Sequence, residues 1–376
     1  MDNTFRIDPG NLQQLIVSIQ KRDYETVGPV VVDEAIAYDR ISAIDDLPIG
    51  WTDEQGPGRY RITKSDDGAY FGCTLPAQSW KRFLYPPFRK LCSIKKNGKS
   101  LEVTTETDGA PNFAFIGVRP CELSAIAIQD KVFSSGDYRD DGYLAVRKSV
   151  FIVAVDCARA GENCFCTSMK TGPGAKDGFD IALTEVIRDG KHYFVGRAGT
   201  EDGLSVLQES GAGVAAEAEI GEAANVVRET AAQITKSMDT RGLPKLLADN
   251  LEHPHWDDVA KRCLTCGNCT MVCPTCFCST VEDVTDLSGQ TAERTRRWDS
   301  CFTMDFAKVS GGNFRISPKS RYRQWLTHKL SSWVEQFGVS GCVGCGRCIT
   351  WCPVGIDITA EVKAIRSTKV KQEKGG

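Results

Sequence analysis

Two stretches of the chain, CLTCGNCTMVCP at residues 263–274 and CVGCGRCITWCP at residues 342–353, share one pattern of cysteines. Each reads C-x2-C-x2-C-x3-C followed by proline. Three thiolates on one tight loop can hold three irons of a [4Fe–4S] cube, and the fourth cysteine then binds the other cube. Structural zinc sites usually combine two C-x2-C pairs, so this longer repeated run fits zinc poorly. The pattern therefore predicts two [4Fe–4S] clusters.

This spacing is typical of two-cluster bacterial ferredoxins, in which the fourth cysteine of each run crosses to the other cluster. We assign the cysteines of the two runs on that basis. Cluster 1 is expected to be bound by Cys263, Cys266, Cys269 and Cys352. Cluster 2 is expected to be bound by Cys342, Cys345, Cys348 and Cys273.

A long insert, residues 279–339, separates the two cysteine runs. Its stretch YRQWLTHKLSSWVEQFG at residues 322–338 places apolar residues on one helical face, and Gly338 is a helix stop. The apolar positions are Trp325, Leu326, Leu330, Trp333, Val334 and Phe337. We therefore expect residues 251–376 to form a mostly helical dicluster ferredoxin domain. His328 lies on this helix, and we interpret it as a packed or solvent-facing residue rather than a metal ligand.

Residues 1–205 read as an α/β domain. The stretch NFAFIGVRPCELSAIAIQDKVF at residues 112–133 predicts a buried strand that ends near Val118 and a helix entered through Pro120. Cys121 is then at the helix amino terminus, where the helix dipole favours a thiolate. A second buried strand, SVFIVAVDC, ends at Cys157, and LTEVIRDGKHYFVG predicts a hairpin that turns at Asp189-Gly190.

Four cysteines of this first half are expected at one edge of the sheet, because the carboxyl ends of neighbouring parallel strands meet there. They are Cys121, Cys157, Cys164 and Cys166, the last two from NCFCTS at residues 163–168. Four thiols are a full ligand set for a third [4Fe–4S] cluster. The alternative is that they are small buried apolar residues, as free cysteine often is. Iron counting separates the two, at about twelve against about eight irons per chain.

A near copy of that stretch, TCFCST at residues 275–280, follows the first cysteine run. Because the run already has its four cysteines, we expect Cys276, Cys278 and Cys301 to pack around the clusters and shield them from solvent. The alternative is that these three form a further site. Cys73 and Cys92 have no cysteine partner in the sequence pattern, and we expect both in the core.

Bulk properties limit the class of protein. The chain has 376 residues, 17 cysteines and a net charge of −3. The sequence begins without the basic and apolar regions of a signal peptide and has no membrane-spanning run, so we expect a cytoplasmic protein in which many thiols indicate metal rather than disulfides. The acidic balance argues against a nucleic-acid partner. The Ala- and Glu-rich residues 206–250 predict a helical connector between the two domains.

Several further stretches resemble one protein family along most of the chain. They are DEQGPGRYR, PAQSWKRFLYPP, GVRPCEL, DCARAGENCFCTS, CPTCFCST, WDSCF, GGNFR and CVGCGRCITWCP. These resemble the iron–sulfur beta subunit of cytosolic, NADP-linked [NiFe] hydrogenases, also called sulfhydrogenases; the related iron–sulfur subunit of anaerobic sulfite reductase is similar. The resemblance implies an electron-transfer subunit whose partners are a flavin- and NADP-binding subunit and the hydrogenase small and large subunits.

The chain lacks residues that a complete catalyst would need. It has no G-x-G-x-x-G turn and no P-loop, and its C-x2-C pairs are used by the two cysteine runs. We therefore expect a relay between a flavin subunit and a [NiFe] hydrogenase module, without a complete catalytic site of its own. One alternative is the electron-transfer subunit of an anaerobic sulfite or sulfur reductase. Another is a structural iron–sulfur module in a nucleic-acid enzyme.

Overall fold

The computed structural model of the chain describes residues 4–105 and 111–368. Its largest element is an eight-stranded sheet in the order β12-β1-β11-β10-β9-β8-β2-β3. Strands β2, β8, β9 and β10 are parallel, and antiparallel strands complete both edges. The strands are β1 (Thr4–Ile7), β2 (Glu25–Val32), β3 (Ala35–Arg40), β8 (Phe113–Val118), β9 (Phe151–Val155), β10 (Ile181–Arg188), β11 (Lys191–Ala198) and β12 (Gly213–Val214).

Helices cover both faces of this sheet, which explains why β8 and β9 are buried along their whole length. On one face α1 (Leu12–Gln20) and α6 (Glu201–Glu209) pack together over an aliphatic core. On the other face lie α3 (Pro120–Ser134) and α4 (Asp141–Lys148), with aromatic residues between them and the sheet. The expected strand–helix unit at residues 112–133 and the hairpin at Asp189-Gly190 are both confirmed.

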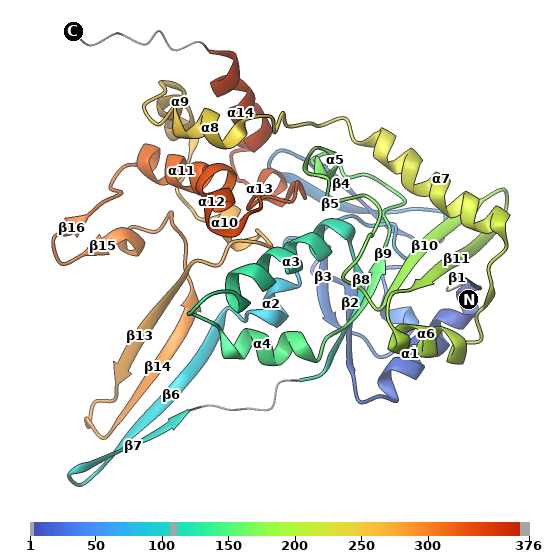
Figure 1. The fold of residues 1–376 in the computed structure, drawn as a ribbon, viewed down its shortest axis with the longest axis horizontal. Helices are drawn as coiled ribbons and strands as arrows, with labels where there is room; N and C mark the ends of the chain where they lie inside the picture. The colour runs from blue at the N-terminus through green and yellow to red at the C-terminus, as the bar shows by residue number, and fades with distance from the viewer. Residues whose placement is uncertain (1–3, 106–110, 369–376) are drawn as a thin grey trace.

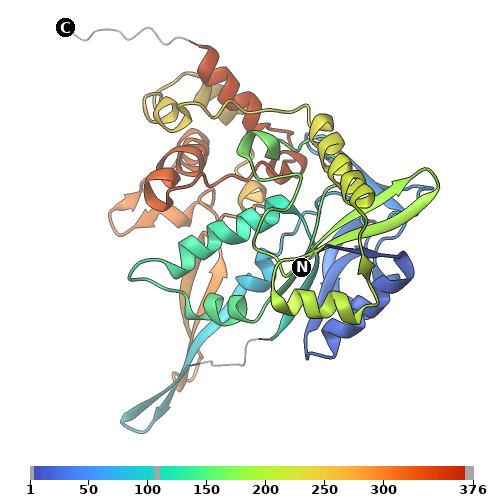
Figure 2. The same cartoon turned by 45° about the vertical axis from the view of Figure 1, so that its right-hand side comes forward.

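The predicted connector is helical in part. Helix α7 (Glu217–Gln233) packs against β10 and β11, with Ala223 buried beside Val186 and Tyr193. An extended segment then leads to α8 (Leu243–Ala248), as Figure 2 shows. The sheet therefore carries the first part of the connector, and the second part belongs to the cysteine-rich end of the molecule.

The cysteine-rich end is built from short helices around a core of aromatic and sulfur-containing side chains. The helices are α9 (His255–Arg262), α10 (Asn268–Met271), α11 (Pro318–Thr327), α12 (Trp333–Phe337), α13 (Arg347–Thr350) and α14 (Ile358–Ser367). A π-helical segment, His328–Ser332, joins α11 to α12. The helix expected at residues 322–338 is confirmed, with Gly338 at a φ of 71° as its end.

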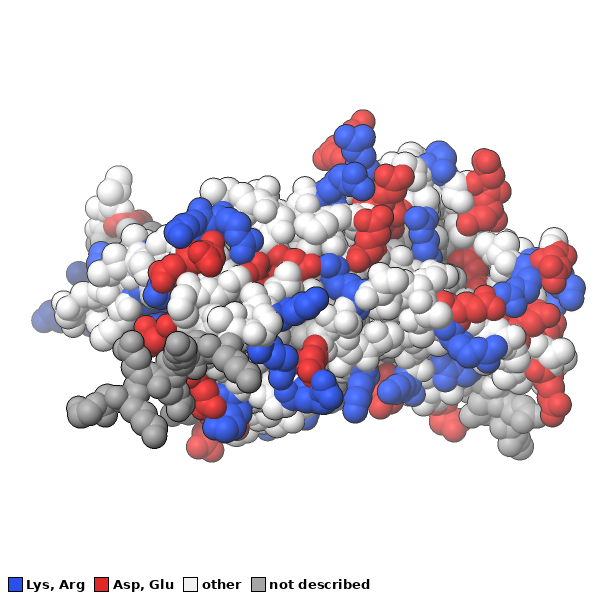
Figure 3. All heavy atoms as spheres, turned by 90° about the horizontal axis from the view of Figure 1, so that it is seen from above, with Lys and Arg blue, Asp and Glu red and all other residues white. Residues whose placement is uncertain are grey.

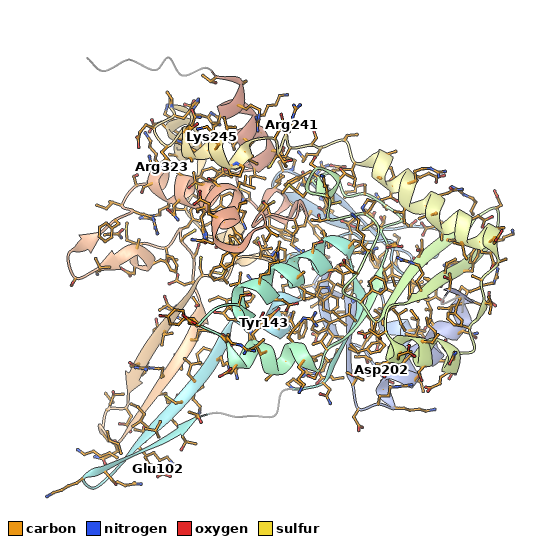
Figure 4. All side chains as sticks on the ribbon, in the orientation of Figure 1. Glu102, Tyr143, Asp202, Arg241, Lys245 and Arg323 are labelled. Carbon is orange, nitrogen blue, oxygen red and sulfur yellow. The ribbon has the colours of Figure 1, made fainter. Side chains whose placement is uncertain are left out.

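The insert is not mostly helical, which corrects the sequence-based expectation. Its first part forms the hairpin β13 (Ser279–Thr285) and β14 (Thr291–Trp298), and a small pair β15 (Lys308–Val309) and β16 (Gly312–Asn313) follows. Strand β14 pairs with β6 (Phe88–Asn97), which pairs with β7 (Ser100–Thr105), so strands from both halves form one arm. The arm projects from the body, with Glu102 on it far from Lys245 and Arg323 (Figures 1 and 4).

The remaining elements lie beside the sheet. They are β4 (Trp51–Gly56) and β5 (Arg59–Lys64), α2 (Lys81–Leu84) and α5 (Cys166–Met169). The turn of the β4–β5 hairpin touches the second cysteine run, because the backbone N–H of Gly58 donates to the carbonyl of Ile349 at 3.1 Å. No helix in the described parts of the chain has the length and apolar character that a membrane span requires.

Candidate metal centre

The two cysteine runs fold alike. Each makes a loop that ends in a one-turn helix, α10 or α13, and these two helices are in contact. In the loops, backbone N–H groups point at sulfur: Thr265 donates to the Cys263 Sγ and Gly344 to the Cys342 Sγ, both at 3.4 Å. Such hydrogen bonds favour thiolate and tune the potential of a bound cluster. The local geometry is therefore suited to an anionic cluster.

The structure brings the first predicted set together. All four of its sulfur-bearing residues line one small cavity, although Cys352 comes from the second run. The rest of the lining is largely apolar and includes Phe302, Tyr322 and Trp325. The set is Cys263, Cys266, Cys269 and Cys352. This crossed arrangement is the one that the spacing predicts.

The second predicted set is also brought together across the two runs. The Cys273 sulfur interacts electrostatically with those of Cys342, Cys345 and Cys348. Burial raises the pKa of all three of these thiols, that of Cys342 to about 12. A buried thiol of raised pKa is held as thiolate only when a cation replaces its proton. Both sets therefore fit metal-bound thiolates.

A buried lysine faces this second set. Lys329 lies in the π-helical segment, and its Nζ donates to the Cys273 Sγ at 3.3 Å and to the Gly341 carbonyl at 2.9 Å. Burial by itself lowers the pKa of Lys329, but the neighbouring sulfurs of Cys273 and Cys276 raise it well above its ordinary value. Lys329 is therefore a fixed positive charge beside a sulfur cluster. The apolar period of the helix predicted the burial of its neighbours and gave no signal for Lys329.

The four cysteines of the first half also converge. The sulfurs of Cys164 and Cys166 interact electrostatically with that of Cys157, and Cys121 interacts with both Cys157 and Cys166. Cys121 is in the first turn of α3, which follows β8, and Cys157 follows β9, so the sheet edge positions them as expected. The four thiols expected to bind a third iron–sulfur cluster thus lie together in the structure. They are Cys121, Cys157, Cys164 and Cys166.

The structure corrects the expectation that the Cys121 side chain is a thiolate. The helix terminus was expected to favour its thiolate, but Cys121 is 5% exposed and burial raises its pKa well above the ordinary value. Nearby sulfurs of Cys345 and Cys166 raise it further. Desolvation outweighs the dipole at this depth, so without a metal Cys121 is a neutral thiol.

The loop with Cys164 and Cys166 lies directly on the second cysteine run. The Phe165 N–H donates to the Gly344 carbonyl at 2.8 Å, and the Asn163 side chain donates to Thr350 Oγ1 at 2.8 Å. Gly344 and Gly346 have φ of 70° and 78°, and a Cβ at Gly346 would stand 2.5 Å from the Asn163 carbonyl oxygen. The glycines therefore allow the close approach of the two loops.

A buried ion pair fixes the same junction. Arg347, within the second run, donates to Glu122 at 2.6 Å, and both side chains are 1% exposed. Glu122 follows Cys121 and also accepts from the Tyr38 hydroxyl at 2.7 Å. The Trp80 indole donates to the same carboxylate at 3.1 Å. Sequence reasoning missed this pair, because nothing in the spacing links residues 122 and 347.

The second Cys-Phe-Cys stretch has a different environment. Cys276 and Cys301 are buried and Cys278 is half-buried, and all three line a cavity beside the π-helical segment. His328 lines the same cavity, with its Nε2 3.1 Å from Gln336 Oε1, and burial lowers its pKa. Of the two cysteines expected in the core, Cys73 is buried and donates to the Trp51 carbonyl, whereas Cys92 is half-buried on the arm.

The spacing of the cysteines within each set distinguishes a single metal ion from a four-iron cluster. Within residues 4–105 and 111–368, no three His, Cys, Asp or Glu side chains are close enough together to hold a single ion. A four-iron cube needs a wider spacing, because each thiolate binds a different iron. The donor type, the N–H···S bonds and the buried lysine all fit such a cluster.

Comparison with known proteins agrees with this geometry. Residues 262–356 match the family model of the 4Fe-4S dicluster domain. The chain is 33% identical over 340 residues to the sulfhydrogenase 2 subunit beta of Pyrococcus furiosus, covering 90% of this chain and 91% of that protein. The alignment thus spans the α/β half as well as the dicluster domain. The chain belongs to the family of sulfhydrogenase beta subunits.

Proposed function

We propose that the chain is the iron–sulfur electron-transfer subunit of a hydrogenase-type complex. The observation that carries this proposal is that each of the three cysteine sets adjoins the next one. The Cys164 Sγ is 4.0 Å from the carbonyl oxygen of Cys345, so the first-half thiols adjoin the second cysteine run. Cys348 in turn lines the cavity of the first ferredoxin set. Three adjoining cysteine sets suit a relay better than an isolated structural site.

We propose three [4Fe–4S] clusters on these sets. Cluster 1 is bound by Cys263, Cys266, Cys269 and Cys352, and cluster 2 by Cys342, Cys345, Cys348 and Cys273. Cluster 3 is bound by Cys121, Cys157, Cys164 and Cys166. When bound, [4Fe–4S] clusters supply one-electron redox chemistry.

The protein residues around the sets have two roles in this proposal. Lys329 and Arg347 are buried cations that offset the negative charge of thiolates and sulfide, which a reduced cluster increases. Apolar residues such as Phe302, Trp325 and Phe165 keep water from the sulfurs. These residues therefore adjust the reduction potentials of the clusters and shield them from water. The Glu122–Arg347 pair fixes the position of the first-half cysteine set relative to the second cysteine run.

The partners follow from the family. The relative is named as a subunit of a sulfhydrogenase. We propose that this chain likewise works in a hetero-oligomer, with a flavin- and NADP-binding subunit and the hydrogenase small and large subunits. Positive and negative side chains are interspersed on the face seen in Figure 3, so docking there depends on shape and mixed charge rather than on one sign.

The test is an anaerobic purification of the complex, followed by iron and acid-labile sulfide analysis of the separated subunit. Counting must use the separated subunit because partners bring clusters of their own. Replacing Cys121 and Cys166 by serine is expected to remove about four irons and four sulfides, one [4Fe–4S] cluster, relative to the unmodified chain. The matched control is Cys73→Ser, another buried thiol, which is expected to keep the full count.

Two results would contradict the proposal. An unchanged iron count in the C121S/C166S chain rules out cluster 3. Copurification with the subunits of a sulfite reductase, instead of hydrogenase subunits, assigns the relay to the other complex.

A further inference from the structure

A second cysteine-lined cavity lies outside the three proposed cluster sites. It has a volume of about 300 Å³. Three cysteines line it, Cys276, Cys278 and Cys301, together with His328 and Lys329. This lining shares no cysteine with the lining of the cluster 1 cavity.

The charges around this cavity favour an anionic occupant. Arg315 and Lys329 are in its lining, and no Asp or Glu is among the described residues that line it. Lys329 is 2% exposed, and its ammonium group is oriented by Cys273 and Gly341. A cluster of iron and sulfide with three thiolates is negatively charged, so these cations match it.

The position of the cavity connects it to both ferredoxin sets. Cys276 packs in the same buried core as Cys273, which belongs to the set of cluster 2, and the two sulfurs interact. The Cys301 sulfur interacts electrostatically with that of Cys269, which belongs to the set of cluster 1. Cys278 and Cys301 line the same cavity and pack in the same core, and their sulfurs interact. The three thiols are therefore mutually close and beside two sets of metal ligands.

We propose that Cys276, Cys278 and Cys301 bind a further [4Fe–4S] cluster in this cavity. Each thiol loses its proton to solvent as its sulfur binds one iron. The fourth iron would have no cysteine, and the imidazole of His328 in the cavity lining could bind it. This site is independent of cluster 3, since the two share no residue.

The experiment uses the full chain within its anaerobically purified complex, with iron and sulfide again counted on the separated subunit. Replacing Cys278 and Cys301 by serine leaves Cys276, which touches Cys273, unchanged. We expect the C278S/C301S chain to lose about four irons and four sulfides, and the matched Cys92→Ser chain to lose none. Equal counts in C278S/C301S and the unmodified chain overturn the proposal.

A second count keeps the test decisive if C278S/C301S does not fold. The C121S/C166S chain lacks cluster 3 by design, so it should hold about twelve irons if the further cluster exists and about eight if it does not. A count of about eight overturns the proposal of the further cluster. An unmodified chain and a C121S/C166S chain that both hold about twelve contradict cluster 3 and support the further cluster.

The open iron gives an independent signal. A cluster with one iron not held by cysteine readily loses that iron on mild oxidation and becomes a [3Fe–4S] cluster. We expect ferricyanide to produce the EPR signal of an oxidised three-iron cluster in the unmodified chain. We expect His328→Ala to strengthen it and C278S/C301S to lack it. A three-iron signal of full intensity in C278S/C301S assigns it to another cluster and contradicts the proposal.

Discussion

At the scale of single residues, Lys329 is a buried charge that contacts the sulfur of a proposed cluster ligand, with its Nζ 3.3 Å from the Cys273 Sγ. We predict that Lys329→Met lowers the reduction potential of cluster 2, because a positive charge stabilises the more negative, reduced state. The shift is on the order of 60 mV, the one-electron equivalent of about 1.4 kcal/mol. Potentiometric titration followed by EPR measures it.

The control for this change is Lys319→Met on α11. Lys319 is partly exposed and pairs with Asp257 at 2.9 Å, away from the sulfurs. The Lys319→Met substitution should leave the reduction potential of cluster 2 unchanged. A cluster 2 potential that is the same in K329M and the unmodified chain would show that Lys329 has only a packing role.

The Glu122–Arg347 pair makes a prediction about stability. Glu122→Gln leaves the Arg347 guanidinium buried without its counter-ion, which typically costs about 3–5 kcal/mol of unfolding free energy. Denaturant unfolding measures the loss. Asp249→Asn, which breaks the exposed pair of Asp249 with Lys245, should cost under about 1 kcal/mol. If E122Q and D249N are equally stable, the buried pair does not join the two halves.

At this scale, the sequence could predict the contacts of those residues whose spacing along the chain follows a known motif. The two cysteine runs predicted which thiols meet, including the exchange of Cys352 and Cys273, because local spacing determines loop geometry. Lys329, Glu122 and Arg347 are buried charges whose partners are remote in the chain. Their burial depends on how the two halves of the chain pack together, and local sequence patterns do not predict that packing.

At the scale of elements, the contact between the 163–166 loop and the second run depends on glycine. Gly346→Ala places a Cβ 2.5 Å from the Asn163 carbonyl oxygen at a φ of 78°. We predict a loss of about 1–3 kcal/mol in unfolding free energy together with a loss of iron from clusters 2 and 3. Gly311→Ala is the control, since its Cβ meets nothing within 4 Å. Full iron content in G346A would argue against a tight junction.

The connector is tied to the dicluster domain by Lys236 and Asp357. Asp357 caps α14 by accepting from the Thr359 N–H at 2.8 Å and pairs with Lys236. Burial by itself raises the pKa of Asp357, but the hydrogen bonds from Lys236 and Thr359 hold it below its ordinary value of 3.8. A lowered carboxyl pKa contributes stability above the unfolded pKa, and this stability is lost as the pH falls through the folded pKa.

Asp357→Asn should therefore cost about 1 kcal/mol near pH 7, because asparagine still caps the helix but the charge that pairs with Lys236 is lost. The difference from the unmodified chain should disappear as the solution is acidified below the folded pKa of Asp357. Urea unfolding at several pH values measures this, with Asp177→Asn, an exposed carboxylate, as the control. A stability gap that is constant across the acidic range would show that the charge of Asp357 does not matter.

The arm shows where element-level prediction failed. The sequence predicts a mostly helical domain here, because residues 322–338 of the insert have a helical period, whereas residues 279–298 form strands β13 and β14. Strand β14 pairs with β6, from Thr291 opposite Lys95 to Arg297 opposite Phe88. Pairing across about two hundred residues leaves no trace in local periodicity, whereas the hairpin at Asp189-Gly190 carries its own turn sequence.

At the scale of the whole molecule, the two halves are joined at several places besides the Glu122–Arg347 pair. The β4–β5 turn meets the second run, the Cys-Phe-Cys loop packs on Gly344, and the arm takes strands from both halves. Contacts on both sides of the predicted connector, residues 206–250, thus join the two halves. The similarity to a sulfhydrogenase beta subunit likewise runs through 90% of the chain.

The central claim is that the adjoining cysteine sets form one electron path through this chain. The most direct measurement is hydrogen-dependent reduction of NADP⁺ by the anaerobically purified complex carrying C121S/C166S. Hydrogen-dependent reduction of a viologen dye in the same preparation controls for the hydrogenase partner. We predict that NADP⁺ reduction falls to background while dye reduction is retained. Full NADP⁺ reduction by the variant complex would contradict the claim.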